Sequence, residues 1–170
     1  MAELTVRAAT SEQDIDAVRT LCWAYRDYLI GFSDTLRPTI ETFYPVDDYA
    51  ALMDVLAQKH ARPGGIILMA ELDGAPVGCG MYYPLSDSDA EIKRVFVQAG
   101  ARGTGAGQAL SKALIDHARA DGYSRVLLDT SKEFKGAQRL YERLGFQARG
   151  SYSDLPPGTE DLLVFYEFTL

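Results

Sequence analysis

The 170-residue sequence is 47% hydrophobic and 24% charged with a formal net charge of −7, which predicts one globular domain spanning residues 1–170 and disfavours nucleic acid as a partner. No apolar stretch approaches the roughly 20 residues of a membrane span and no secretory leader is visible, so we expect a cytoplasmic protein with no membrane partner. The cysteines, Cys22 and Cys79, and the two histidines predict neither a disulfide framework nor a metal site.

The N-terminal third predicts one strand and two helices. Residues Leu4–Ala8 alternate as a strand does, and apolar residues then recur at helical spacing up to a stop at Gly31. The segment Phe32–Pro45 is rich in turn-forming and aromatic residues. A second helix is expected over Val46–Ala61.

The middle of the chain predicts an antiparallel meander. Two strands, Ile66–Glu71 and Pro76–Tyr83, flank the turn dipeptide Asp73-Gly74. A third strand, Ile92–Val97, follows after a short polar turn. Three strands joined by such short turns are typical of neighbours in one antiparallel sheet.

The remainder alternates helices and strands. We expect helices at 103–121 and Phe134–Leu144, and strands at Arg125–Asp129, Phe146–Arg149 and Leu162–Leu170. The predicted fold is therefore of the α/β (α+β) class, with a mixed, twisted central sheet of about seven strands flanked by four helices.

A glycine-rich segment lies between the third strand of the meander and the next helix. Gly103, Gly105 and Gly107 let the backbone approach a ligand closely, and the first N–H groups of a helix have no partner inside it. This arrangement predicts an anion site. A P-loop would require Lys and Ser or Thr after the last glycine, where Gln108 and Ala109 stand instead.

Two nucleotide-binding alternatives remain for this segment. A dinucleotide-binding turn would require a third glycine where the sequence has Leu110, although Asp129 follows near the position of a ribose-binding acid. The stretch Arg102-x-x-Gly105-x-Gly107 instead resembles the Q/R-x-x-G-x-G/A signature of the GCN5-related N-acetyltransferases. A later stretch, Ala137-x-x-Leu140-Tyr141-x-x-x-Gly145-Phe146, is similar to the second signature of that family.

The resemblance implies acetyl-coenzyme A as co-substrate and a specific set of contacts. The loop is expected to hold the pyrophosphate, the strand before it the thioester, and the second signature to close the site. The implied cofactor-binding residues are Val95, Phe96, Val97, Arg102, Gly103, Thr104, Gly105, Ala106, Gly107, Phe134, Ala137 and Tyr141. One position departs from the family, because Phe134 replaces an asparagine that often contacts the pantetheine arm.

The resemblance also implies two catalytic roles. Tyr141 is expected to protonate the leaving thiolate. Glu91 matches the position of the catalytic glutamate in the histone-acetylating branch, and is the predicted general base. The alternative for Glu91 is an exposed edge charge, or an ion pair with Lys93 or another neighbour. Glu71 and Asp129 are further carboxylates that could act as the base.

The sequence thus predicts transfer of an acetyl group from acetyl-CoA to a primary amine of a small molecule or peptide, by direct nucleophilic attack. The alternatives are a CoA-binding module without catalysis and a dinucleotide-binding oxidoreductase. Amino acids, polyamines, aminoglycosides and protein N-termini all remain open as acceptors. A homodimer is possible, since many members of the resembled family pair through sheet edges.

Overall fold

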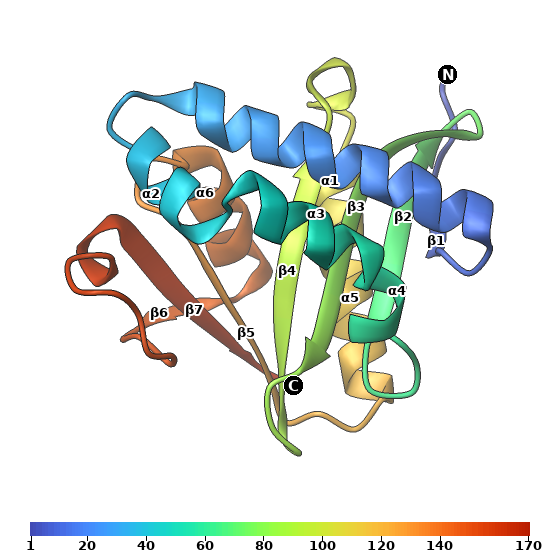
Figure 1. Cartoon of the computed structure of the whole chain (residues 1–170). Coiled ribbons are helices and arrows are strands. Elements are labelled where there is room, and N and C mark those ends of the chain that lie inside the picture. Colours follow the sequence, from blue (N-terminus) through green and yellow to red (C-terminus); the bar gives the residue numbers. More distant parts are fainter.

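The computed structural model describes residues 1–170 and has one seven-stranded mixed sheet at its centre (Figure 1). The strands occur in the order β1-β2-β3-β4-β5-β7-β6, and only the β4–β5 pair is parallel. Their bounds are β1 (Leu4–Ala8), β2 (Ile66–Leu72), β3 (Ala75–Pro84), β4 (Asp89–Val97), β5 (Arg125–Ser131), β6 (Gln147–Arg149) and β7 (Leu163–Thr169). The prediction of a mixed sheet of about seven strands is confirmed.

The structure has six α-helices, so the expected number of four was too low. They are α1 (Glu12–Phe32), α2 (Arg37–Phe43), α3 (Val46–Asp54), α4 (Leu56–Lys59), α5 (Ala106–Ala120) and α6 (Lys135–Leu144). The predicted helix over 46–61 is broken at Val55, which departs from helical geometry and joins α3 to α4. The short α2 lies in the segment expected to be a turn-rich loop, and Pro38 lies in its first turn, where no N–H partner is needed.

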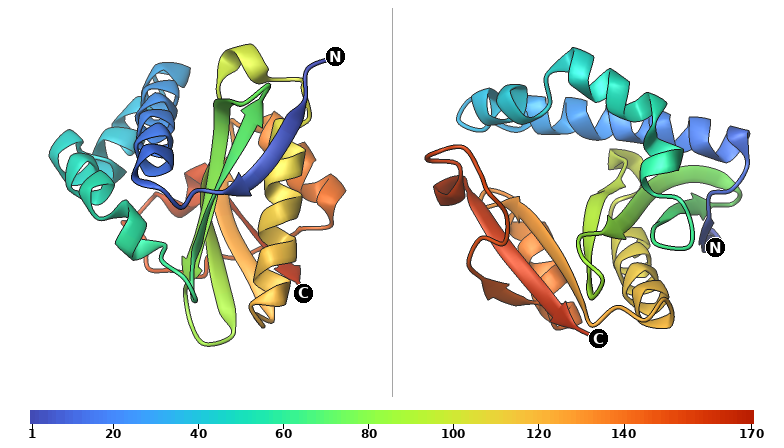
Figure 2. Two further views of the ribbon diagram at one scale, coloured as in Figure 1. Left: turned by 90° about the vertical axis from the view of Figure 1, so that its right-hand side faces the viewer. Right: turned by 60° about the horizontal axis from the view of Figure 1, so that its bottom comes forward.

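Helices cover both faces of the sheet. Figure 2 shows α1 to α4 on one face and α5 and α6 on the other. Apolar side chains of α5 pack on one side, centred on Leu110 and Leu114, while Val18 and Cys22 of α1 pack on the opposite side. None of the helices is long and apolar enough to span a membrane.

Helix α1 begins at a capping box. The Ser11 hydroxyl accepts a hydrogen bond from the Asp14 amide at 3.0 Å, and the Asp14 carboxylate accepts one from the Ser11 amide. Arg7 of β1 donates to both oxygens of Asp14, so the start of the helix is tied to the edge strand. These contacts fix α1 across the sheet, and its C-terminal half thereby reaches the region described below.

The two parallel strands β4 and β5 separate along their length. They are paired only at their starts, where Asp89, Ala90 and Glu91 lie opposite residues 125–127. Beyond this point the strands diverge (Figure 1), leaving one edge of β4 unpaired from Ile92 to Val97. A V-shaped opening in the middle of the sheet results.

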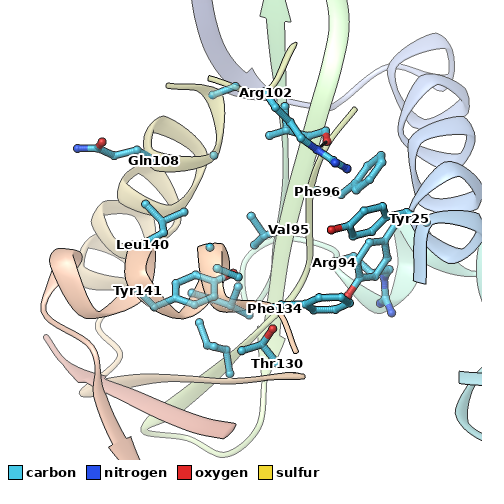
Figure 3. A pocket seen from close by; sticks show the side chains of 18 of the residues that line it. Tyr25, Arg94, Val95, Phe96, Arg102, Gln108, Thr130, Phe134, Leu140 and Tyr141 are labelled. Carbon is cyan, nitrogen blue, oxygen red and sulfur yellow. Dashed lines mark hydrogen bonds between the residues drawn. The ribbon is translucent and has the colours of Figure 1, made fainter. Parts of the chain in front are cut away.

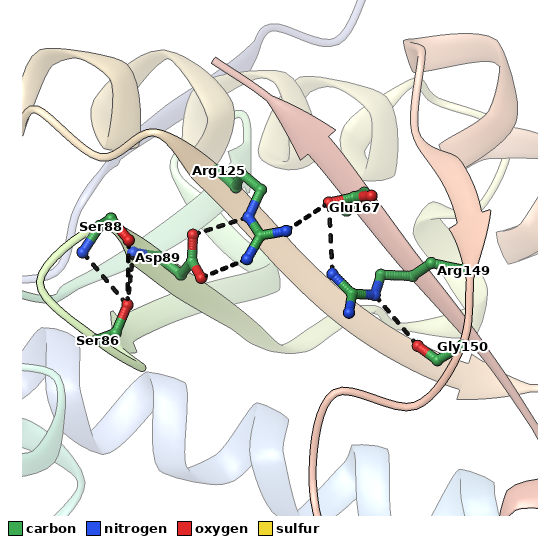
Figure 4. A network of polar contacts seen from close by, with 7 residues as sticks. All are labelled: Ser86, Ser88, Asp89, Arg125, Arg149, Gly150 and Glu167. Atoms are coloured by element: carbon green, nitrogen blue, oxygen red, sulfur yellow. Dashed lines mark hydrogen bonds and ion pairs between the residues drawn. The ribbon is translucent and has the colours of Figure 1, made fainter.

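A chain of ion pairs holds the closed end of the V (Figure 4). Arg125 of β5 donates to both oxygens of Asp89 on β4, at 2.9 and 2.7 Å, and to Glu167 of β7 at 3.0 Å. Arg149 of β6 contacts the same Glu167 oxygen at 3.4 Å. Four strands are therefore tied together where β4 and β5 are still paired, and the opening begins beyond this point.

Candidate functional site

The V between β4 and β5 is the floor of a cleft of about 750 Å³, within the size range of small-molecule sites. Side chains from α1, β4, β5 and α6 line it together with the loop before α5. Figure 3 shows Tyr25 on one side, Tyr141 on the opposite side, and Val95 of β4 between them. All but two of the site residues expected from the sequence line this cleft; the two exceptions are Glu91 and Thr104.

The loop before α5 carries a run of free amides. None of the N–H groups of residues 103–108 donates a hydrogen bond to another group of the protein, because they precede or begin the helix. Gly103 and Gly105 have φ angles of 82° and 88°, in the left-handed region where glycine is not strained. Thr104 is exposed outside the cleft, and its hydroxyl donates to the Ala101 carbonyl at 2.6 Å. The loop therefore has free backbone N–H groups of the kind that suit an anion.

Three cationic side chains line the cleft. They are Arg102, Lys135 and Arg143, and all are exposed. Arg102, next to the loop, donates to the Val97 carbonyl at 3.2 Å, and its guanidinium lies 4.4 Å from the centre of the Tyr28 ring. Free amides and cations in one cleft favour an anionic ligand such as one with phosphate groups.

The unpaired edge of β4 forms one wall. Between the pairs Cys79↔Phe96 and Met81↔Lys93 the β3–β4 register shifts, and Arg94 in this bulge has a φ of 52°. Backbone groups of Val95 and Val97 that would bond a neighbouring strand have no strand beside them. An extended ligand with amide groups can take the place of that strand.

Tyr141 enters the cleft from α6 and is 7% exposed. Its ring packs against Phe146 and Tyr166, which fixes the direction of the side chain. The hydroxyl has no hydrogen-bond partner in the protein. Burial, and then the negative charge of Asp129, raise the pKa of Tyr141 above its ordinary value, so the phenol stays protonated at neutral pH. It can donate a proton to a group in the cleft.

Glu91 is buried beneath the cleft and does not line it. Its two carboxylate oxygens accept hydrogen bonds from the hydroxyls of Tyr83 and Tyr152, the latter at 2.6 Å. The Nζ atom of Lys93 lies 3.5 Å from it, so the ion pair considered from the sequence is present. Glu71 is also outside the cleft, paired with Arg7 at 3.0 Å.

Aromatic rings form the roof. Phe134 stands where the resembled family often has asparagine, and packs against Tyr28 and Phe32 of α1 at 5.8 and 4.6 Å between ring centres. The ring thus bridges from the α6 side to α1. Phe134 supplies an apolar surface where asparagine would supply a hydrogen bond.

The sequence and fold of the chain are similar to those of known proteins. A family model described as the acetyltransferase (GNAT) family matches residues 33–146. An uncharacterised N-acetyltransferase of Schizosaccharomyces pombe is 32% identical over 155 residues, covering 90% of this chain and 88% of the relative. The chain belongs to the acetyltransferase (GNAT) family.

Further similarities are consistent with this membership. The IAA acetyltransferase of Azospirillum brasilense is 33% identical over 143 residues, covering 84% of this acetyltransferase and 90% of the relative. The PaiA N-acetyltransferase of Thermoplasma acidophilum, solved with coenzyme A, has the same fold with a TM-score of 0.70 at 14% identity over 99% of both chains. The sequence-based prediction of an acetyl-CoA-dependent N-acetyltransferase is confirmed at the level of the family.

Sequence reasoning missed part of the acetyltransferase cleft. Lys93, Thr130 and Glu133 line it but were not expected there, and Asp129 was only a lesser candidate. Aromatic residues of the N-terminal third also line the cleft, although most of them were expected to lie in the core. They are Tyr25, Tyr28, Phe32 and Tyr44. No local motif marks these positions. A weak signal was present for Asp129, a charge that directly follows a buried apolar strand.

Proposed function

We propose that this acetyltransferase binds acetyl-CoA along the V and acetylates a primary amine that enters between α1 and β5. The chemistry of the residues suits each part of the donor. The free amides of 103–108 and the neighbouring Arg102 suit its phosphates, and Lys135 and Arg143 add positive charge to the same cleft. The unpaired edge of β4 suits the amides of the pantetheine arm, and Phe134 offers that arm an apolar contact.

Acetyl-CoA supplies an acetyl group activated as a thioester. Backbone N–H groups at Val95 to Val97 are proposed to hold the thioester oxygen, where negative charge develops. Tyr141 is proposed to give its proton to the sulfur as the C–S bond breaks. The observation that carries this proposal is that the hydroxyl-bearing side chain of Tyr141 lines the same cleft as the unpaired edge of β4 and makes no hydrogen bond within the protein.

The role of Glu91 as a general base stays a prediction. Because both of its oxygens are bonded to tyrosine hydroxyls and it does not line the cleft, it would receive a proton through Tyr83 or Tyr152. The structure therefore supports an indirect role better than direct contact with the acceptor amine. A cytoplasmic location and a homodimer also stay predictions.

A panel of amines tests the proposal. Phenylalanine, spermidine, kanamycin, 2-phenylethylamine and a peptide with a free N-terminus are each incubated with acetyl-CoA, and thiol release is followed. We expect amine-dependent release with at least one class. Acetyl-CoA binding without release for any amine would favour the non-catalytic CoA-binding module. A titration with NAD(P)H that shows tight binding would favour the oxidoreductase.

A further inference from the structure

Asp129 is the carboxylate of β5 that faces the cleft. The last residue of β5 paired with β4 is Leu127, opposite Glu91, so Asp129 lies two residues beyond it, where the V has opened. It lines the cleft, and a quarter of its side chain remains exposed. A charged group in this position can touch a molecule bound between the strands.

The carboxylate of Asp129 has few partners of its own. Its one ion pair is with Lys93 at 4.0 Å, and the nearby Tyr152 hydroxyl, which lowers the pKa of Asp129, donates to Glu91 at 2.6 Å. Glu91 is the opposite case, because two tyrosine hydroxyls and Lys93 already occupy its oxygens. Asp129 thus keeps free acceptor positions for an ammonium group, and Glu91 does not.

Lys93 holds the two carboxylates in place. Its Nζ atom lies between them, 3.5 Å from Glu91 and 4.0 Å from Asp129. Burial favours the neutral amine, but the nearby Tyr44, Asp129 and Glu91 outweigh it, and the pKa of Lys93 is raised overall. Lys93 therefore stays charged and cannot itself take a proton from the acceptor.

Charged and titratable groups face Asp129 from every neighbouring element. They are Lys93 and Glu91 on β4, Tyr141 on α6, Tyr25 on α1 and Tyr152 on the segment before β7. Burial is the main cause that raises the pKa of Asp129; Glu91 adds to it, and Lys93 and Tyr152 oppose it. A raised pKa makes this carboxylate a stronger base than an exposed aspartate. The charge of Asp129 also raises the pKa of Tyr141, as the largest cause after burial.

We propose that Asp129 is the catalytic base that accepts the proton of the acceptor ammonium, and that Lys93 is its positioning residue. The inference rests on the proposed acetyl transfer in the cleft. In it Asp129, and not the Glu91 expected from the sequence, is the base that contacts the amine. Glu91 then acts through Lys93, by keeping that side chain charged and oriented.

The proton balance fits two groups. The acceptor R–NH3⁺ gives one proton to Asp129, which later releases it to solvent. The neutral amine forms the C–N bond while the C–S bond breaks, and Tyr141 protonates the departing sulfur. The second proton on nitrogen then replaces the one that Tyr141 gave up. One proton is released for each acetyl group transferred, and both catalytic groups return to their starting state.

The kinetic test compares three isosteric variants, using the amine that turns over fastest in the panel. Asp129→Asn should lower kcat/KM at pH 7 at least 10²-fold, with a rate that recovers as pH rises and free amine becomes abundant. Its affinity for CoA by calorimetry should stay within about twofold of the wild type. Glu91→Gln should lose less than Asp129→Asn. The matched control Glu133→Gln, which removes another cleft carboxylate, should keep the shape of the wild-type pH profile.

A second measurement needs neither turnover nor a variant that folds well. Carboxyl ¹³C NMR of the wild-type protein should show Asp129 titrating above the ordinary aspartate range. An Asp129 pKa at or below the ordinary aspartate value, or an unchanged rate in Asp129→Asn, overturns the inference. Absence of amine-dependent thiol release from the wild type would instead contradict the proposed function.

Discussion

The orientation of the Tyr141 side chain is set by residues outside its sequence motif as well as within it. The ring is held by Phe146 and Tyr166 in edge-to-face and tilted contacts, and the side chain lines the cleft with no hydrogen bond from its hydroxyl to the protein. A molecule bound in the cleft can therefore supply the partner of that hydroxyl.

We therefore predict that Tyr141→Phe lowers kcat about 10²-fold or more, since the ring is retained and only the proton is lost. Calorimetry should show little change in acetyl-CoA affinity. The matched control is Tyr166→Phe, which removes a neighbouring hydroxyl that donates to Glu142 at 2.9 Å outside the cleft. If Tyr141→Phe keeps the wild-type kcat when chemistry limits the rate, then the thiolate leaves without this acid.

At the scale of elements, the loop before α5 and the helix act as one unit. The helix begins at Ala106, three residues later than its glycine-rich sequence predicted, because Gly103 and Gly105 have positive φ angles that a helix excludes. The delayed start leaves more amides free than a helix beginning at Gly103 would. The glycines are thus the cause of both the turn and the run of free amides proposed to bind the phosphates.

A variant tests this unit. Gly105→Val should weaken acetyl-CoA binding at least tenfold, about 1.4 kcal/mol, because a β-branched residue is disfavoured at a φ of 88° and the amides must reorient. The control is Gly100→Ala in the preceding turn, where a Cβ meets nothing within 4 Å and φ is not positive. Calorimetry measures the acetyl-CoA affinity of both variants, and melting curves verify that both are folded. Equal affinities in the two folded variants would remove the loop from the site.

At the scale of the whole molecule, buried hydrogen bonds of His60 join the end of α4 to strands β3 and β4. His60 is 2% exposed; its Nδ1 lies 2.9 Å from the Tyr82 carbonyl and its Nε2 lies 3.0 Å from the Arg94 guanidinium. Burial is the main cause that lowers the pKa of His60 to about 4, and the charge of Arg94 adds to it. The histidine is therefore neutral in the folded protein at physiological pH.

This predicts a loss of stability in mild acid. Well above pH 6.5 His60 is neutral in both states and contributes no pH dependence. Between about pH 6.5 and 4 the unfolded chain binds a proton that the folded chain does not, so the free energy of unfolding falls as pH falls, by up to about 3 kcal/mol. Urea unfolding across this range measures it. His60→Gln, whose amide can make both hydrogen bonds, should flatten the dependence. An equal slope in the variant would assign it to other groups.

The sequence alone determined those features that rest on local chemistry. Hydrophobic periodicity predicted the seven strands and the long helices α1, α5 and α6, because one face of each must be buried. The glycine spacing indicated the anion site, because only backbone conformation is involved. The segment 32–61 was less well predicted, because α2 and the break at Val55 depend on packing over the sheet rather than on propensity.

The tertiary structure decided how the reactive groups are used. Glu91 and Asp129 are both carboxylates on strands, and nothing in the local sequence distinguishes an occupied carboxylate from a free one. Tyr152, 61 residues from Glu91 in the chain, occupies one of its oxygens, while the divergence of β4 from β5 exposes Asp129 to the cleft. Which acid can reach an amine is set by strand pairing and by distant hydroxyls. Such contacts join parts of the chain that only folding brings together.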